Sequence, residues 1–143
     1  MNINAPLNPN VGIVINYLNE KQVPHTQRIF DAPACSAEQA ADLLSCPLGA
    51  IVKSLVFEMT ASDRLLLALV SGQNRADLQK LSTLAREPVR VAAPKTVLSK
   101  TGFPVGAVPL SGLEGISQTY IDADLMSFQH VWASAGLKTS LLN

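Results

Sequence analysis

One lysine occupies a position where a charged side chain is costly. Residues 49–75 consist of two apolar runs rich in Val, Ile and Leu, joined by a polar turn at 60–64, and this pattern predicts two adjacent antiparallel strands. The period of two places Lys53 on the same face as Ile51 and Leu55. Because an unpaired buried charge costs several kcal/mol, this side chain either reaches water at a sheet edge or serves a function.

A loop dense in glycine and proline is the second feature that suits a binding site. Residues 102–112 read GFPVGAVPLSG. Proline restricts such a loop to a few conformations, and glycine lets a ligand approach the backbone. We therefore expect a ligand to contact this loop at Gly102, Gly106 or Gly112.

Metal and nucleophile chemistry find little support in the sequence. His25 and His130 lie far apart, and Cys35 and Cys46 lack a CxxC spacing, so we predict no metal site. No Gly-rich phosphate loop, GxSxG or HExxH motif is present, and no cofactor is predicted. Cys35 follows a Pro-containing turn, which leaves open a nucleophilic role beside that of a small apolar side chain.

The composition predicts a globular domain. The chain has 143 residues, of which 48% are hydrophobic and 15% charged, enough to bury a core and too apolar for disorder. It contains no apolar run of about 18 residues and no basic, apolar leader at its N-terminus. We therefore expect a cytoplasmic protein that does not span a membrane.

The charges are balanced overall but not along the chain. A net charge of zero argues against strong non-specific nucleic-acid binding, which depends on phosphate neutralisation. Residues 75–100, however, hold six basic and two acidic side chains, a net charge of +4. This segment is either an ordinary solvated face or a local contact for a phosphate backbone.

Hydrophobic periodicity predicts one α+β domain over residues 1–143, with a mixed, largely antiparallel, curved sheet flanked by short helices. Residues 1–10 should be coil. In a helix over 76–86, we expect Leu78, Leu81, Leu84 and Ala85 to face the core. The other helices are expected at 11–18, at 36–44 with Ser36 as its cap, and from Pro94 to just before Gly102. Further strands are expected at 23–30, 89–92, 119–122, 131–135 and 138–142.

Five short motifs occur in an order that resembles a known family. They are IVKSLVF at 51–57, SGQNR at 71–75, TGFPVG at 101–106, YID at 120–122 and VWASAG at 131–136. With these motifs, residues 25–138 resemble the YbaK-like aminoacyl-tRNA deacylases, a family that includes the editing domain inserted in bacterial prolyl-tRNA synthetases.

The resemblance implies roles for particular residues. Lys53 matches the strand lysine associated with activity, and Gly106 matches the glycine that opens a GxxxP element, so both are implied catalytic residues. Ser134 matches a residue that lines the pocket. The further substrate-binding candidates within these motifs are Ser54, Asn74, Arg75, Gly102 and Gly136.

The resemblance also implies the reaction. It is the trans-acting hydrolysis of the ester between a wrong amino acid and the 3′ end of a tRNA, usually the tRNA for proline carrying alanine or cysteine. Such an ester is already activated, so a site needs only to orient water and stabilise an oxyanion. The resemblance further implies that the tRNA's own terminal hydroxyl activates the water. The implied partners are the aminoacylated tRNA end and, as a second candidate, an aminoacyl-tRNA synthetase.

The chain departs from the family pattern at one position of the loop. Leu110 stands where the GxxxP element ends in proline, with Pro109 one place earlier. One alternative is therefore a non-catalytic module of the same fold that binds aminoacyl-tRNA ends or a synthetase. A second is a scaffold domain in which Lys53 merely extends to water.

For three further sets of residues, the sequence allows two interpretations each. Asp122 and Asp124 either orient substrate or form an ordinary turn. Trp132 either stacks on the terminal adenine or packs in the core. His25 either lies at the mouth of the pocket or simply occupies a strand.

Overall fold

The computed structural model describes residues 9–29, 36–110, 113–137 and 140–142. Within these ranges the helices are α1 (Pro9–Glu20), α2 (Ala37–Leu44), α3 (Leu78–Ala85) and α4 (Pro94–Thr101), and the 3₁₀ segments are η1 (Leu48–Ala50) and η2 (Ala123–Ser127). The strands are β1 (Gln27–Ile29), β2 (Val52–Met59), β3 (Arg64–Ser71), β4 (Val89–Val91), β5 (Ile116–Ile121), β6 (Ala133–Leu137) and β7 (Ser140–Leu142).

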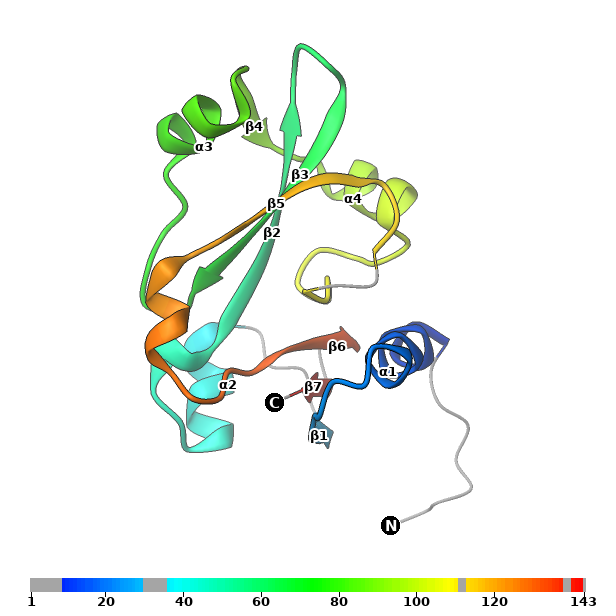
Figure 1. Ribbon diagram of the computed structural model, residues 1–143, viewed down its shortest axis with the longest axis vertical. Coiled ribbons are helices and arrows are strands. Elements are labelled where there is room, and N and C mark those ends of the chain that lie inside the picture. The colour runs from blue at the N-terminus through cyan, green and yellow to red at the C-terminus, as the bar shows by residue number, and fades with distance from the viewer. Residues whose placement is uncertain (1–8, 30–35, 111–112, 138–139, 143) are drawn as a thin grey trace.

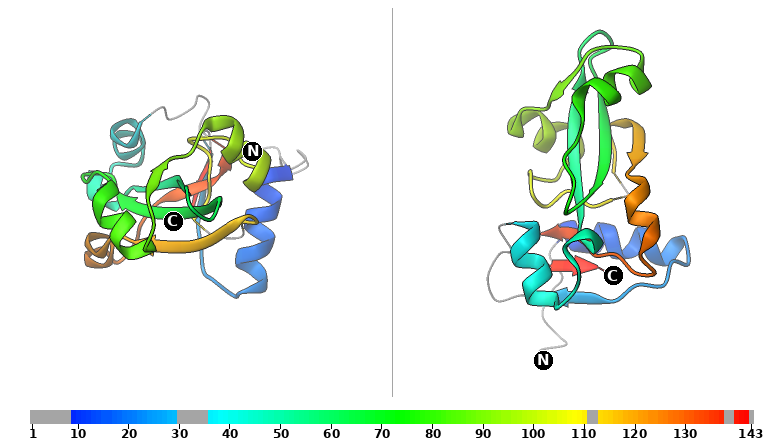
Figure 2. Two further views of the ribbon diagram at one scale, coloured as in Figure 1. Left: turned by 90° about the horizontal axis from the view of Figure 1, so that it is seen from above. Right: turned by 90° about the vertical axis from the view of Figure 1, so that its left-hand side faces the viewer.

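The strands form two sheets. The larger has the order β4-β2-β3-β5 and the smaller the order β1-β7-β6. Among the strand pairs that the structure describes, only β3–β5 is parallel, and an isolated parallel bridge joins Ile51 to Trp132. In Figure 1 the β2–β3 hairpin rises above the smaller sheet and α1, and Figure 2 shows the same arrangement from two other sides. The predicted α+β class with a mixed, largely antiparallel sheet is confirmed, with the strands divided between two sheets.

The hairpin is buried on both of its faces. Its register runs from Val52 opposite Ser71 to Met59 opposite Arg64, and side chains alternate between the two faces. Val52, Val56 and three leucines of β3 belong to one core cluster, which includes residues of α1 and α4. Phe57, Met59 and the other face of β3 belong to a second cluster beneath α3. Such burial explains the near-continuous apolar sequence of both strands.

The α3 helix contacts the core through a narrower stripe than its sequence suggests. Leu81 and Ala85 are buried, as predicted. The prediction was wrong for Leu78 and Leu84, which are 42% and 49% exposed. The helix has only eight residues, and it covers the sheet with side chains one turn apart, so its flanking leucines lie at the rim.

Two predictions near the N-terminus need correction. The coil predicted for residues 1–10 ends earlier, because α1 begins at Pro9, a residue suited to the first helical turn. Residues 1–8 lie outside the described ranges. The strand predicted over 23–30 is short, since β1 covers only Gln27–Ile29 and Pro24 has no N–H to donate to a ladder. At the other helix ends, Ser36 accepts a hydrogen bond from the Gln39 N–H and Gly102 caps α4 with a φ of 80°, as the sequence predicts.

Candidate functional site

A cavity of about 650 Å³ lies along one edge of β2. It opens there because β4 pairs with β2 only at Phe57–Met59, which leaves the preceding residues of β2 at a sheet edge. The cavity is lined by residues of β2, α2, α4, the segment before α4, the loop after α4, and β6. Four predicted site residues are among them, namely Lys53, Ser54, Gly106 and Ser134. They come from three parts of the sequence, so the fold brings them to one hollow.

The cavity contacts side chains from both faces of β2. Ile51, Lys53 and Leu55 belong to one face of the strand, and Ala37 and Ala40 of α2 line the wall on that side. On the Ser54 side the lining includes Val97 of α4, Val108 and Gly106. The cavity therefore extends around the edge of β2, from the face that carries Lys53 to the face that lies near the Gly106 loop.

The ammonium group of Lys53 is held by a neutral partner. The side chain is half-buried, and its Nζ donates a hydrogen bond to the backbone carbonyl of Asn74. Within the described ranges the ion pairs are Glu58–Arg90 and Asp63–Lys100, so no carboxylate there neutralises Lys53. The positive charge at this wall therefore remains available to an anionic or polarisable ligand.

Asn74 is fixed by two carboxylates. Its side-chain amide nitrogen donates to Asp122 Oδ2 at 2.8 Å and to Asp124 Oδ2 at 2.7 Å. Asp122 also accepts from the backbone N–H of Ser71 at 3.0 Å and of Asp124 at 3.0 Å. Both N–H bonds of the Asn74 amide are thus in use, and Asn74 does not line the cavity. In this arrangement Asn74 positions Lys53 through its carbonyl.

The Asp122 carboxylate is stabilised in its ionised form. Burial by itself raises the pKa of Asp122, but hydrogen bonds from Asn74, Asp124 and Ser71 outweigh burial and hold that pKa below its ordinary value. Sequence reasoning left Asp122 and Asp124 as either substrate ligands or an ordinary turn. The structure gives them a third role, as the anchor of the residue that holds Lys53.

Ser54 presents polar groups at the open edge of β2. The Val52 N–H donates to the Trp132 carbonyl at 2.8 Å, and the Val56 carbonyl accepts from the Ala92 N–H at 3.2 Å. Backbone groups alternate in direction along a strand. Ser54 lies midway between Val52 and Val56, so its N–H and C=O point to the same side as theirs, away from β3 and toward the open edge. The Ser54 Oγ is buried and has no hydrogen-bond partner among the described residues. The sequence predicted the short strand at 89–92, but not that it would pair with one end of β2 and leave this edge open.

The glycine-containing loop forms one wall of the cavity. The Ala107 N–H donates to the Pro104 carbonyl at 3.0 Å, which makes residues 104–107 a turn with Gly106 at its third position. Gly106 has a φ of 86°, as a type II turn requires there. Ala107 and Val108 are buried, so the loop is anchored while Gly106 remains exposed.

Besides Asn74, three predicted site residues lie outside the cavity lining. Arg75 is exposed to solvent. Gly102 ends α4 and is also exposed. Gly136 is buried with a φ of 100°, and its N–H donates to Ser134 Oγ at 3.1 Å. Gly136 therefore acts on the site only by orienting Ser134.

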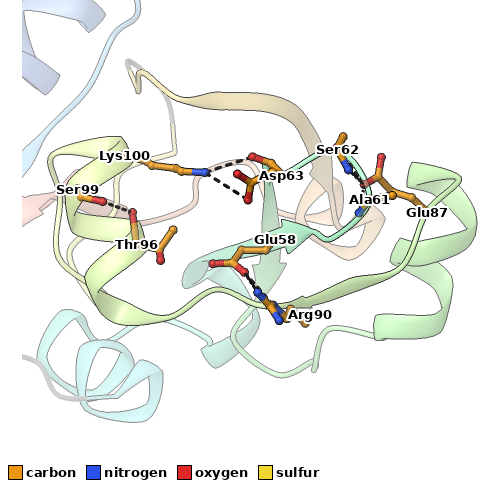
Figure 3. Close-up of polar contacts among 9 residues, drawn as sticks. All are labelled: Glu58, Ala61, Ser62, Asp63, Glu87, Arg90, Thr96, Ser99 and Lys100. Carbon is orange, nitrogen blue, oxygen red and sulfur yellow. Dashed lines mark hydrogen bonds and ion pairs between the residues drawn. The ribbon is translucent and has the colours of Figure 1, made fainter.

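Residues 75–100, the segment with a net charge of +4, present their basic side chains to solvent. All six of these side chains are exposed, and two of them form ion pairs, Arg90 with Glu58 at 2.8 Å and Lys100 with Asp63 at 4.0 Å. These pairs lie around the turn of the β2–β3 hairpin (Figure 3). A phosphate-contacting role for the other four residues stays a prediction.

A second cavity, of about 430 Å³, adjoins the first. It is lined by Val14, Leu18, Val23, Pro24, His25, Thr26, Leu110, Gln129, His130, Val131, Ala133 and Ser134. Ser134 lines both cavities. Leu110, at the position that departs from the family pattern, thus contacts the second cavity and not the one that Lys53 lines.

The other sequence candidates have simpler environments. Trp132 is half-buried against a small cluster that contains Ile51. Cys46 is half-buried, and burial raises the pKa of its thiol, which disfavours a nucleophilic thiolate; Cys35 lies outside the described residues.

In the described ranges no three His, Cys, Asp or Glu side chains gather as metal ligands. No helix there has the length and apolarity needed to cross a membrane.

Comparison with known proteins places the chain in a family. Residues 31–143 match the model of the aminoacyl-tRNA editing domain. The chain therefore belongs to the aminoacyl-tRNA editing domain family, and the resemblance drawn from its motifs is confirmed.

Particular relatives agree with this assignment. The chain is 30% identical over 113 residues to the uncharacterized protein YwhH of Bacillus subtilis (strain 168), a match that covers 79% of this chain and 71% of YwhH. It is also 30% identical over 99 residues to the proline–tRNA ligase of Thermosipho africanus (strain TCF52B), covering 68% of this chain but only 17% of the ligase.

Among solved structures, a protein proposed to be a trans-editing enzyme for prolyl tRNA synthetase superposes with a TM-score of 0.87 at 35% identity, covering 96% of this chain and 87% of the other. The hypothetical protein APE2540 superposes with a TM-score of 0.84 at 28% identity, covering 91% and 86%.

Proposed function

We propose that this protein hydrolyses the ester bond of mischarged aminoacyl-tRNA in trans, with the tRNA for proline carrying alanine or cysteine as its substrate class. The observation that carries the proposal is the cavity lined jointly by Lys53, Ser54, Gly106 and Ser134. Membership of the editing-domain family supports the reaction class. The similarity to a proposed trans-editing enzyme and to a segment of proline–tRNA ligases supports the choice of tRNA.

The chemistry rests on charge and orientation. The Lys53 ammonium, held by a neutral carbonyl, attracts the terminal phosphate or polarises the ester carbonyl, and the ligand's charge offsets the cost of removing the lysine from water. Backbone N–H groups beside Gly106 stabilise the oxyanion that forms as water attacks. The terminal tRNA hydroxyl assists in activating that water, so the protein supplies no nucleophile of its own.

The remaining candidate residues have supporting roles in this proposal. Ser54 and Ser134 contact substrate within the cavity, where both are lining residues. Gly136 and Asn74 orient Ser134 and Lys53 respectively. Gly102 ends the helix that leads into the loop, and Arg75, exposed just after Asn74, contacts tRNA phosphates outside the cavity.

A deacylation screen tests the proposal. Wild-type protein and Lys53→Ala are incubated with a panel of misacylated tRNAs, and release of the amino acid is followed with time. We expect wild type to hydrolyse at least one alanyl or cysteinyl tRNA for proline, and Lys53→Ala to lose that activity while its circular dichroism spectrum stays unchanged. Absence of hydrolysis across the whole panel by wild type would exclude the proposal.

A second candidate is a non-catalytic module that binds aminoacyl-tRNA ends or a synthetase. Leu110 favours it, because the proline that normally closes the loop element is absent here. Tight binding of a non-hydrolysable aminoacyl-adenosine analogue without turnover of any tRNA in the panel would select this candidate.

A further inference from the structure

The second cavity has a lining that differs in kind from the Lys53 cavity. Its volume, about 430 Å³, falls within the roughly 300–1,000 Å³ typical of small-molecule sites. Val14 and Leu18 of α1 and Ala133 of β6 give it an apolar floor, and all three are buried. The polar lining residues other than Ser134 are His25, Thr26, Gln129 and His130.

This polar set suits a nucleobase. Imidazole rings stack on bases, and a glutamine side chain forms paired hydrogen bonds with N6 and N7 of adenine. Among the described residues, no aspartate or glutamate lines the cavity, so none of them repels a ligand that carries phosphate. A flat, largely apolar ring with hydrogen-bonding edges matches an apolar floor below such a rim.

Ser134 connects this cavity to the proposed reaction site. It lines both cavities, and its Oγ accepts a hydrogen bond from the Gly136 N–H at 3.1 Å. Among the described residues that oxygen donates to no acceptor, so its own hydrogen is available to a ligand. A residue that lines both cavities is suited to contact a ribose that carries a base on one side and an acyl group on the other.

We propose that the second cavity binds the adenine of the terminal adenosine of tRNA, while the acyl group occupies the Lys53 cavity. The ribose then lies at Ser134, whose hydroxyl donates to a ribose oxygen. His25 and His130 contact the faces of the base, and Gln129 reads its N6 and N7 edge. The identity of the nucleoside rests on the proposed function, but its binding to this cavity is measurable without any deacylation.

The two histidines provide a selective probe. The chain contains only His25 and His130, and both line this cavity, so imidazole C–H resonances in an NMR spectrum report on it alone. Adenosine is titrated into the full-length protein, with cytidine as the comparison ligand. We expect adenosine to shift both imidazole signals to saturation, and cytidine to bind at least tenfold more weakly.

Variants at exposed positions identify the cavity. Thr26 is exposed at its rim, and Thr26→Trp should block entry, weakening adenosine binding at least tenfold and raising the KM for misacylated tRNA. Met126 is 71% exposed and lines neither cavity, so Met126→Trp is the matched control and should bind adenosine as wild type does. If Thr26→Trp does not fold, Gln129→Ala takes its place and should abolish the preference for adenosine over cytidine.

The outcomes separate this inference from the proposed function. Imidazole signals that ignore adenosine, or that shift equally in wild type and Thr26→Trp, overturn the inference even if wild type deacylates tRNA. Saturable adenosine binding in the cavity with no hydrolysis of any misacylated tRNA supports the inference and refutes the deacylase function.

Discussion

The charged side chains at the two ends of β2 have partners of different kinds. Near the hairpin turn, the buried Glu58 is paired with Arg90, whose Nε and a terminal nitrogen both lie 2.8 Å from the same carboxylate oxygen (Figure 3). Beside it, Glu87 Oε1 accepts from the N–H groups of Ala61 and Ser62 at 3.1 and 2.9 Å. Both carboxylates have pKa values below the ordinary range, chiefly because of the hydrogen bonds from Arg90 and from Ser62 respectively.

At the other end of the strand, Lys53 and Ser54 have polar groups that can still accept a charged or hydrogen-bonding partner. Among the residues described, Lys53 is bound by a carbonyl and by no carboxylate, and the Ser54 hydroxyl has no hydrogen-bond partner there. A cavity of about 650 Å³ adjoins both. Native folds normally satisfy buried polar groups, so a buried Ser54 hydroxyl that lacks a partner in the described part of the chain, beside this cavity, supports our proposal that a ligand binds at the open edge.

The largest loss of stability should follow from removing the anchor behind Lys53. Asp122→Ala deprives three N–H donors of their acceptor, those of Ser71, Asn74 and Asp124. At about 1 kcal/mol for each lost hydrogen bond, the free energy of unfolding should fall by about 3 kcal/mol in urea denaturation at pH 7. Asp124→Ala is the matched control, since it removes one acceptor at an exposed position and should cost about 1 kcal/mol. Equal stability of the two variants would contradict this role for Asp122.

A pair of glycine substitutions separates packing from backbone conformation. A Cβ at Gly136 would lie 3.0 Å from both the Asn10 carbonyl oxygen and Phe103 Cε1, whereas one at Gly102 would meet nothing within 4 Å. Both glycines have positive φ, which costs an alanine about 1 kcal/mol. We expect Gly136→Ala to lower the unfolding free energy by about 2 kcal/mol and Gly102→Ala by about 1 kcal/mol. Thermal melting measures both, and a Gly102 variant as unstable as the Gly136 variant would show that crowding around Gly136 is unimportant.

The stability that the Glu58–Arg90 pair contributes should decrease at low pH. Arg90→Ala leaves the buried Glu58 carboxylate without its partner, and we expect a loss of about 1 kcal/mol at pH 7. Because Arg90 lowers the pKa of Glu58 in the folded state, the pair stabilises the fold above the ordinary pKa of 4.5 and this contribution disappears as the pH falls through the lowered value.

Urea denaturation at pH 7 and pH 3 tests this, and the difference between wild type and Arg90→Ala should shrink at pH 3. A difference that grows at pH 3 would reverse the sign and refute the assignment. Arg90 lines neither cavity, so deacylation at pH 7 should be unaffected.

The smallest effect is expected at Ser54, and it has the opposite sign. Removing a buried hydroxyl without a partner relieves a desolvation cost, so Ser54→Ala should raise the unfolding free energy by up to about 1 kcal/mol. If the hydroxyl also contacts substrate, the KM for misacylated tRNA rises in the same variant. Ser54→Ala that is less stable than wild type would mean that the hydroxyl has a partner in the fold.

The hairpin could be predicted because two apolar runs separated by a short polar turn are a local feature of the sequence. Periodicity also located Lys53 on an apolar row. The cavity beside Lys53 depends on β4 pairing with only Phe57–Met59 of β2 and on the Gly106 loop lying across the cavity from β2. These long-range contacts have no local signal in the sequence. The role of Asn74 was likewise hidden. Its amide N–H groups donate to Asp122 and Asp124, about 50 residues later in the chain, so a residue expected to bind substrate instead supplies a carbonyl for Lys53.

Our central proposal is that Lys53, which forms no ion pair among the described residues, keeps its charge available for a ligand. Lys53→Met tests it most directly, because methionine retains the length of the side chain and removes its charge. Single-turnover hydrolysis of alanyl-tRNA for proline is compared between Lys53→Met and wild type, together with the melting temperature of each. The account predicts a rate at least 100-fold lower, equivalent to about 2.7 kcal/mol, in a protein at least as thermostable as wild type. An unchanged rate would contradict it and leave Lys53 as a side chain that only extends toward water.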